Sequence, residues 1–167
     1  KLRSGNTEFL VGKDAMSCGP GRMGNFLLTD NATPLTRIQI ATIEPVRYRG
    51  LLRHLGAIQA RVFLSKLGDR EYWDGKDWRD HNKPGFYVMR LDFQTAPDFA
   101  WGVGYNSMFG GRGIPISFTD YLSMIVGQTN VWKGQDKWNG QAGLDFRWRF
   151  PKAGGMQLYG GLYLEDS

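Results

Sequence analysis

The sequence has 167 residues, of which 41% are hydrophobic, 14% are aromatic and 23 are glycine. A helical membrane span is excluded because no run approaches the roughly 20 apolar residues required, and the single Cys18 excludes a disulfide framework and a cysteine-based zinc site. The net charge of +5 allows an acidic partner, but the arginines are spread over extended segments and not clustered on a helix, which argues against nucleic acid.

Most of the chain is predicted to form β-strands, because apolar and polar residues alternate with a period of two. Two short helical segments are expected as well, at 49–56 and at 118–127, where Thr119 supplies a cap and Gly127 an end. The sequence therefore predicts an all-β chain that forms a segment of one domain over 1–167. The predicted strands, in chain order, are 8–16, 36–43, 57–67, 85–94, 99–109, 140–150 and 156–166.

The segment GLDFRWRF at 143–150 shows the alternation most clearly, with charged side chains on one face and leucine and aromatic side chains on the other. In a soluble sheet the apolar face needs a second layer, and two short helices cannot cover seven strands. In a membrane barrel the apolar face meets lipid and the charges line the lumen. A β-sandwich made of the strands themselves is the soluble alternative.

The connections between the predicted strands divide by length into two sides. Short turns at 95–98 and 151–155 lie on one side, together with the longer segment 44–56. Outer-membrane barrels have short periplasmic turns and long extracellular loops, so the chain is predicted to form an antiparallel transmembrane β-barrel. Because open sheet edges are not tolerated in lipid, its seven or so strands are expected to be part of a larger barrel. The long connections on the predicted outer side are 17–35, 69–84 and 110–139.

Two stretches are more specific than this periodicity. VGKDAMSCGPGRMGNFLLTDNATP at 11–34 contains Gly-Pro-Gly, an apolar triplet and then TDNATP. The stretch 89–130 joins a strand, a Thr-Ala-Pro-Asp turn, a second strand ending in FGGRG, and a loop with SFTDYL. Together they resemble the capsule assembly Wzi family, outer-membrane β-barrels of Gram-negative bacteria, over residues 8–166. Cys18 departs from the family, which usually has tryptophan there.

The resemblance implies an 18-stranded barrel in the bacterial outer membrane, blocked by loops that fold inward. It implies a lectin that binds and anchors capsular polysaccharide at the cell surface, with no catalysis and no cofactor. The expected partners are the lipid bilayer with its lipopolysaccharide, an acidic surface polysaccharide and other envelope proteins. A diffusion porin and a scaffold barrel within a larger envelope assembly remain the alternatives.

Charged residues of the predicted lumen face form the first set of candidate site residues. Their mixed signs on neighbouring strands suit a structural network of cross-strand pairs, because buried charges need partners. The excess of arginine also fits a polar constriction that contacts carboxylate or phosphate groups of a glycan. The set is Arg37, Arg61, Arg90, Asp92, Asp145, Arg147, Arg149 and Glu165.

Aromatic and polar residues of the long loops form the second set. Aromatic rings stack on the C–H faces of sugars and carboxylates accept hydrogen bonds from hydroxyls, which is the chemistry of glycan binding; aromatic packing on the barrel rim is the alternative. The set is Tyr72, Trp73, Asp74, Asp77 and Trp78 in the first loop, and Arg112, Trp132 and Trp138 in the second.

The loops are also considered as a plug, as metal sites and as a catalytic site. The connection 110–139 is too long for an idle loop, so we expect it to fold inward or to bind something, and a plug is the preferred role. The aspartates of 69–84 do not follow the EF-hand spacing, although a looser calcium site stays open. His54 and His81 fall on opposite sides of the predicted barrel, so no shared metal site is expected, and no catalytic constellation is recognisable.

Overall fold

The computed structural model describes residues 1–14, 34–68, 70–73, 78–81, 83–111, 114–125, 128, 131–132 and 135–165. Within these ranges, only the backbone is described for 70–73, 78–81, 131–132 and 135–136. The loop that follows β2 (Thr7–Lys13) thus lies outside the described residues from position 15 to 33.

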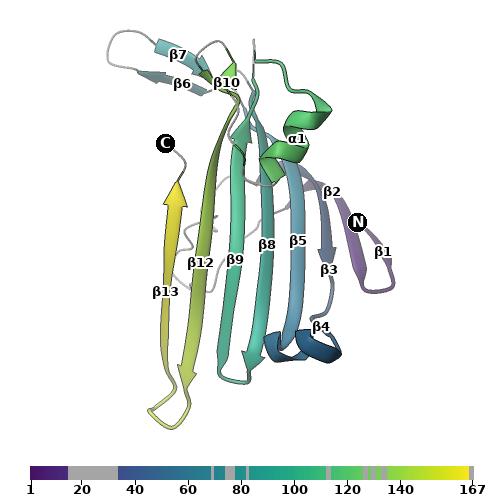
Figure 1. Cartoon of the computed structure of the whole chain (residues 1–167), viewed down its shortest axis with the longest axis vertical. Coiled ribbons are helices and arrows are strands. Elements are labelled where there is room, and N and C mark those ends of the chain that lie inside the picture. Colours follow the sequence, from purple (N-terminus) through teal and green to yellow (C-terminus); the bar gives the residue numbers. More distant parts are fainter. Residues whose placement is uncertain are drawn as a thin grey trace.

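One antiparallel sheet dominates the fold, with β1 and β13 at its edges (Figure 1). Two separate hairpins are β6 (Arg70–Trp73) with β7 (Trp78–His81) and β10 (Val131–Trp132) with β11 (Gln135–Asp136). The prediction of an all-β, antiparallel chain is confirmed. The large sheet has the order β1 (Leu2–Ser4), β2, β3 (Thr36–Thr42), β5 (Ala57–Lys66), β8 (Gly85–Ala96), β9 (Phe99–Phe109), β12 (Trp138–Phe150) and β13 (Met156–Glu165), and β4 (Val46–Arg47) pairs with β5.

All seven predicted strands are present, with differences at their ends. β8 continues two residues further than expected, to Ala96, with a register shift against β9 between Gln94 and Ala96. The Gln94 amide donates to the Ala96 carbonyl oxygen at 2.5 Å and so satisfies a backbone group at this irregularity. The expected helix at 49–56 is a short 3-10 helix, η1 (Gly50–Leu55).

The connections are distributed over the two ends of the sheet as predicted. The turn between β8 and β9, the turn 151–155 and η1 lie at one end, and α1 (Phe118–Ile125) lies at the other (Figure 1). Strict antiparallel pairing forces this alternation, because each strand returns the chain to the opposite end. The two long connections after β5 and β9 therefore share the α1 end.

The two faces of the sheet have an inverted pattern of burial. On β3, Arg37 and Gln39 are 4% and 5% exposed, whereas the alternating Ile38 and Ile40 are 61% and 51% exposed. On β12, Asp145 is 2% exposed, whereas the preceding Leu144 is 48% exposed. We call the face that carries Arg37, Gln39, Arg90 and Asp145 the polar face, and the face that carries Ile38, Ile40, Leu144 and Trp148 the apolar face.

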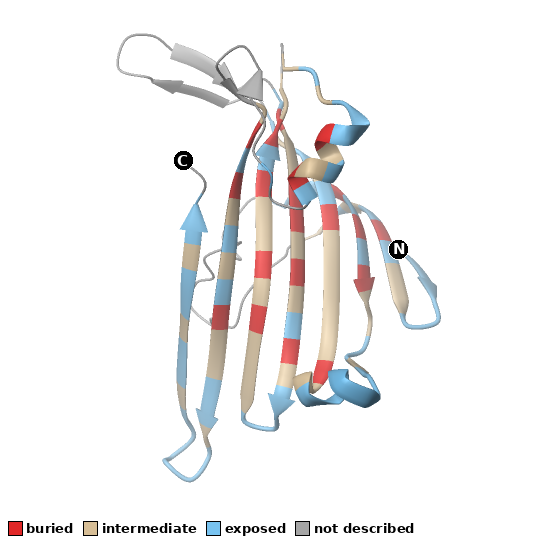
Figure 2. Cartoon of the chain, viewed as in Figure 1, coloured by how far each residue is buried: buried red, intermediate tan, exposed pale blue. Residues whose placement is uncertain are grey.

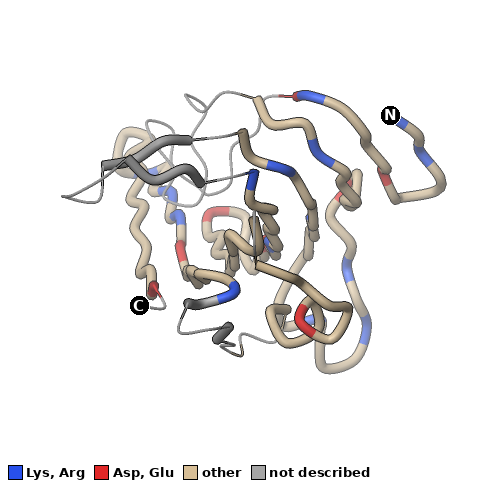
Figure 3. The backbone as a smooth tube through the Cα atoms, turned by 90° about the horizontal axis from the view of Figure 1, so that it is seen from above, with Lys and Arg blue, Asp and Glu red and all other residues tan. Residues whose placement is uncertain are grey.

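Burial is concentrated in the central strands. Figure 2 shows buried positions spaced along β5, β8, β9 and β12, while β13 carries only half-buried and exposed residues. Seen from above, the backbone follows a curved path, and Lys, Arg, Asp and Glu positions recur along it (Figure 3). The charges therefore lie along the strands as well as in the connections.

Helix α1 covers one end of the apolar face. Met124 packs against Tyr87, Phe109 and Trp138, and the Tyr121 ring meets the Phe109 ring edge-on at 5.3 Å between centroids. The expectation that the connection 110–139 folds inward is therefore wrong for its helix, because an apolar helix surface is matched by the aromatic patch and not by the charged face. No helix in the described part of the chain is both long and apolar enough to cross a membrane.

Candidate functional site

The centre of the polar face is held by one buried ion pair. Arg90 on β8 binds Asp145 on β12 through two parallel contacts, Nη1 to Oδ2 at 2.5 Å and Nη2 to Oδ1 at 2.6 Å. Both side chains are 2% exposed. A bidentate arginine–carboxylate pair neutralises both charges and also fixes the orientation of both side chains. This contact therefore ties together two strands that are not neighbours.

Two further side chains complete this network. Asp92 Oδ1 accepts from Arg90 Nε at 2.9 Å and lies 2.7 Å from Nη2. The Tyr163 hydroxyl on β13 donates to Asp145 Oδ2 at 3.1 Å. The network thus extends from β8 to β13, and the buried guanidinium faces two carboxylates, which is the satisfaction that a buried charge requires.

Gly102 has no side chain, and the network occupies the space that a side chain there would fill. Strand β9 separates Arg90 from Asp145, and Gly102 on β9 pairs directly with both Asp92 and Asp145. A Cβ atom at Gly102 would lie only 2.6 Å from Arg90 Cζ and 2.8 Å from Asp92 Oδ1. The guanidinium therefore crosses β9 directly over a position where any side chain would block it.

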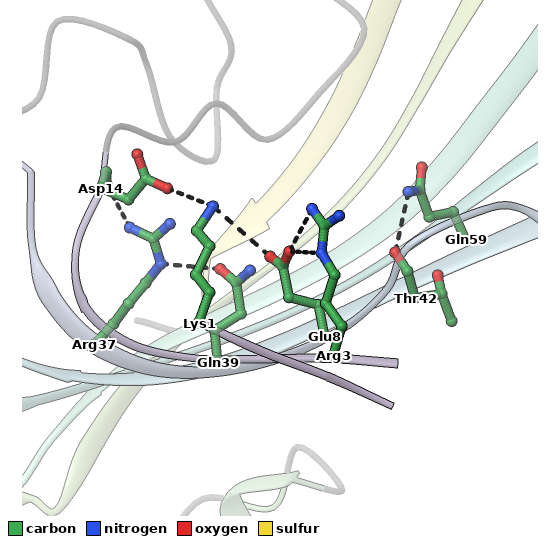
Figure 4. Close-up of polar contacts among 8 residues, drawn as sticks. All are labelled: Lys1, Arg3, Glu8, Asp14, Arg37, Gln39, Thr42 and Gln59. Atoms are coloured by element: carbon green, nitrogen blue, oxygen red, sulfur yellow. Dashed lines mark hydrogen bonds and ion pairs between the residues drawn. The ribbon is translucent and has the colours of Figure 1, made fainter. Parts of the chain in front are cut away.

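A second polar cluster lies at the β1 edge of the same face. Figure 4 shows Lys1, Glu8, Arg37 and Gln39 with side chains that rise from one side of the sheet. Arg37 Nε donates to Gln39 Oε1 at 2.9 Å, and its Nη1 donates to the backbone carbonyl of Asp14. Lys1 Nζ lies 3.0 Å from Asp14 Oδ2 and 3.9 Å from Glu8 Oε1. This cluster ties the first two strands to β3.

The remaining predicted lumen residues lie on the same face. Arg61 on β5 stands opposite Arg90 in the register, and its Nε atom is buried without a hydrogen-bond partner in the described structure. Arg147 is half-buried on β12, while Arg149 and Glu165 are exposed. All eight predicted residues share the polar face, and the contacts of the described side chains bring Arg90, Asp92 and Asp145 together in one network.

Sequence reasoning missed two members of the network, Tyr163 and Gly102. The signal for Tyr163 is an aromatic residue at a polar-face position of β13, a feature that it shares with Tyr159. The signal for Gly102 is its place in FAWGVGYN, where Gly102 and Gly104 take two successive polar-face positions of β9 and leave both without side chains. Two successive glycines on one face of a strand, between strands that carry charges, indicate that a long side chain crosses the strand there.

Most of the loop residues predicted to bind glycan lie where the structure does not describe side chains. Trp138 is described, and it is 5% exposed because its ring packs in the cluster under α1. It therefore offers no exposed face to a sugar, and we leave it out of the proposed binding surface. The residues Tyr72, Trp73, Asp74, Asp77, Trp78, Arg112 and Trp132 lie outside the residues whose side chains are described.

The α1 end of the sheet holds two pockets that share the segment Phe109–Gly110. One has a volume of about 360 Å³ and reaches from the end of β5 to α1. The other has a volume of about 470 Å³ and is lined by Lys137, Trp138 and Asn139 at the start of β12. Within the described residues, no group of three or more His, Cys, Asp and Glu side chains is placed to hold a metal ion.

An ion pair anchors α1 at this end. Lys137 Nζ donates to both carboxylate oxygens of Asp120, at 3.0 and 2.9 Å. The Ser117 backbone N–H donates to Asp120 Oδ2 at 2.8 Å, as does the Ser117 hydroxyl. The Ser117 backbone N–H, and then Lys137, hold the pKa of the Asp120 carboxyl well below its usual range. Asp120 therefore stays charged and connects the helix start to β12.

Comparison with known proteins gives one clear result. The family model described as capsule assembly protein Wzi matches residues 1–167, the whole chain. No curated protein and no solved structure matches it. The match covers both clusters of the polar face, the apolar face and α1 in one continuous span. The chain therefore belongs to the Wzi family of capsule assembly proteins.

Proposed function

We propose that this chain is part of a non-enzymatic outer-membrane β-barrel that binds surface polysaccharide during capsule assembly. The observation that carries the proposal is the inverted sheet, with leucine and isoleucine exposed on one face and a completed ion network buried on the other. Family membership supplies the role in capsule assembly. The exposed apolar face of the sheet supports a location in the lipid bilayer.

The apolar face supports a membrane location on energetic grounds. Exposed leucines follow β13 at alternate positions: Leu158, Leu162 and Leu164 are 51%, 63% and 66% exposed. Apolar surface in water costs about 25 cal/mol per Å², and soluble monomers rarely expose large contiguous patches of it. Lipid removes this cost for the whole face at once, without a second protein layer.

The polar face and the α1 end support an acidic glycan as ligand. Arginine on the polar face, with Arg61 beside the completed Arg90 network, suits the carboxylates or phosphates of an acidic polysaccharide. The loops after β5 and β9 share one end, which on this proposal is the cell surface. Their aromatic residues, among them Trp73 and Trp78, are the proposed contacts with sugar rings.

The membrane part of the proposal is tested with nitroxide labels in the full chain reconstituted into lipid bilayers. Labels at Leu158 and Leu162 should be accessible to oxygen and protected from a water-soluble nickel reagent, because they face hydrocarbon. A label at Gln157 is the matched control on the polar face of the same strand and should show less oxygen access. Equal accessibility at all three positions would refute the membrane assignment.

The glycan part is tested by binding of capsular polysaccharide to the reconstituted chain. Trp73→Ala and Trp78→Ala together should reduce binding, since they remove the proposed stacking surfaces. Trp101→Ala is the matched control, because it also removes a tryptophan but on the apolar face, and it should leave binding unchanged. Equal binding by the loop variant and the wild-type chain would remove these tryptophans from the site.

A diffusion channel is the second candidate, and the charged polar face is the observation in its favour, since porin lumens are lined in this way. Single-channel recording separates the two candidates. Steady open conductance would favour a channel, whereas a closed barrel that retains polysaccharide favours the binding protein.

A further inference from the structure

Helix α1 presents two different apolar sides. Successive residues of an α-helix are about 100° apart around its axis, so the sequence gives each side chain a direction. Tyr121 and Met124 pack against the sheet, and Met124 is 1% exposed. Phe118, Leu122 and Ile125 are instead 76%, 51% and 44% exposed. They follow the i, i+4, i+7 spacing and so form one stripe within an arc of about 60°. We call these three residues the outer stripe.

The third side of α1 carries hydroxyl groups. Thr119 is exposed and Ser123 is half-buried, and the two lie one helical turn apart. The one charged residue within α1 is Asp120, which is 4% exposed and bound by Lys137. A helix that faces water carries charged and polar residues on its exposed side. The exposed surface of α1 carries apolar groups and hydroxyls without an exposed charge, which suits the boundary between hydrocarbon and headgroups.

The aromatic residues of the apolar face indicate the depth at which α1 lies. At the turn end of the sheet Phe99 meets Trp148 edge-on, with 5.8 Å between ring centroids. At the other end Tyr87 and Trp138 belong to the cluster under α1. The row of paired residues midway between these two groups is aliphatic: Leu91, Val103, Leu144 and Leu162. Aromatic groups on both sides of an aliphatic band are typical of a barrel wall that crosses a bilayer.

The distance between the two aromatic groups matches the thickness of a membrane. Trp138 and Trp148 are ten residues apart on β12, which corresponds to about 34 Å along the strand. At the strand tilt of about 40° found in outer-membrane barrels, this becomes about 26 Å along the membrane normal, against an apolar band about 25 Å tall. With Trp148 at one interface, the level of Trp138 and α1 therefore coincides with the other interface.

At this second interface α1, and not the aromatic rings of the sheet, forms the outermost layer. Trp148 is 47% exposed at the turn end, whereas Tyr87 and Trp138 are each 5% exposed because α1 covers them. The rings of the sheet are thus withdrawn from the surrounding medium at the α1 end. The outer stripe occupies the position that an exposed aromatic ring would have there.

We propose that α1 lies in the outer leaflet, with the outer stripe in contact with lipid acyl chains and the hydroxyl side directed toward the headgroups. This inference rests on the proposed outer-membrane location. Eight residues of helix are about 12 Å long, so α1 lies along the boundary and does not cross the bilayer. The lipid thereby holds α1 against the barrel wall. The connection between β9 and β12 is then fixed to the membrane surface, beside the loops proposed to bind polysaccharide.

The test uses nitroxide labels in the full chain reconstituted into lipid bilayers, each on a single cysteine in a Cys18→Ser background. Labels in Leu122→Cys and Ile125→Cys should have high access to oxygen and low access to a water-soluble nickel reagent, because they face hydrocarbon. Thr119→Cys is the matched control on the hydroxyl side of the same helix, and its ratio of oxygen to nickel access should be lower. All three native side chains are exposed, so the labels leave the packing of α1 on the sheet intact.

Two other coverings of the outer stripe give different results. High nickel access at Leu122 and Ile125 would place the stripe in water and overturn the inference. Low access to both reagents would mean that protein covers the stripe, as a second copy of the chain would, and would also overturn it. Equal ratios at Leu122 and Thr119 would contradict the proposed orientation of α1.

A label in Leu162→Cys, on the apolar face of β13, separates this inference from the proposed location. If Leu162 has the ratio expected for hydrocarbon and Leu122 does not, the membrane location stands and the position of α1 is refuted. If Leu162 itself is accessible to nickel and not to oxygen, the membrane location is refuted, and the position of α1 with it.

Discussion

Two arginine–carboxylate pairs of the polar face, Arg90–Asp145 and Arg3–Glu8, differ in their exposure to solvent. Arg90 and Asp145 are each 2% exposed and meet through two contacts of 2.5 and 2.6 Å. Arg3 and Glu8 meet through contacts of 3.1 and 3.2 Å, but the Arg3 side chain is 65% exposed. The Arg90 contacts reach both oxygens of Asp145, whereas both Arg3 contacts reach Glu8 Oε2. Solvent also screens the second pair and not the first, so the two pairs have very different consequences for stability.

The comparison shows where this sheet depends on its charges. A buried pair is not a simple source of stability, because both charges lose water; its importance is that neither partner tolerates loss of the other. The exposed pair can exchange its partner for water at little cost. The central strands are therefore sensitive to single substitutions that the β1 edge should tolerate.

Asp145→Ala tests the buried pair and should have the largest effect on stability of the variants considered. It leaves Arg90 buried with Asp92 alone and removes the acceptor of Tyr163, so we expect a loss of about 3–5 kcal/mol in the free energy of unfolding. Urea titration of the refolded chain in detergent measures it. The double variant Arg90→Met, Asp145→Leu should recover most of the loss, since no unpaired charge remains. A double variant as unstable as Asp145→Ala would contradict this account.

Gly102→Ala should disturb the same network by placing a methyl group under the Arg90 guanidinium. The new methyl group would lie 2.6 Å from Arg90 Cζ and force the guanidinium off its carboxylates, so we expect a loss of about 1–3 kcal/mol from overpacking. Gly68→Ala is the matched control, because a Cβ atom there meets nothing within 4 Å. The same titration should find the control unchanged; equal losses in both variants would mean that steric overlap is not the cause.

The Asp120–Lys137 anchor extends the comparison to a titratable pair. The pKa of Asp120 is lowered in the folded chain, so its contribution is complete above the ordinary aspartate pKa of about 3.9 and is lost as pH falls below it. The protection factors of the α1 amides, which are the intrinsic exchange rate at each pH divided by the observed rate, should fall on acidification, and Asp120→Asn should show lower protection already at pH 7. The variant and wild type should converge at low pH. A constant difference at every pH would exclude this carboxylate as the cause.

Arg3→Ala is expected to have the smallest effect. An exposed arginine–carboxylate pair contributes about 0.2–1 kcal/mol, and salt reduces it further. Urea titration at low and high salt should give a small difference that shrinks with salt. A loss as large as that of Asp145→Ala would mean that exposure does not separate the two clusters.

Most of the fold can be predicted from the sequence because one physical signal repeats along it. The alternation of 143–150 predicts both β12 and the separation of its charged and apolar residues onto two faces. The lengths of the connections predict which of them share an end. These properties depend only on neighbours in sequence, and antiparallel pairing then transmits them from strand to strand.

The contacts of the site depend on residues from distant strands and could not be predicted in the same way. The position of α1 is decided by Tyr87, Phe109 and Trp138, which meet only after β8, β9 and β12 have paired. Helix length and caps predict α1 but not the face that it covers. The β6–β7 hairpin carried a usable signal, since Asp-Gly at 74–75 separates two aromatic segments and favours a tight turn.

The order of the strands has a consequence for how the chain reaches this fold. In the half from β8 to β13, each strand of the sheet pairs with the next large-sheet strand along the chain, and β8–β9 and β12–β13 are joined by short turns. Such hairpins close local loops and form quickly. The sheet can therefore grow one hairpin at a time during its biogenesis. The ion pair between β8 and β12 forms only once β9 is seated between them, so it reports that the hairpins have joined in the correct register.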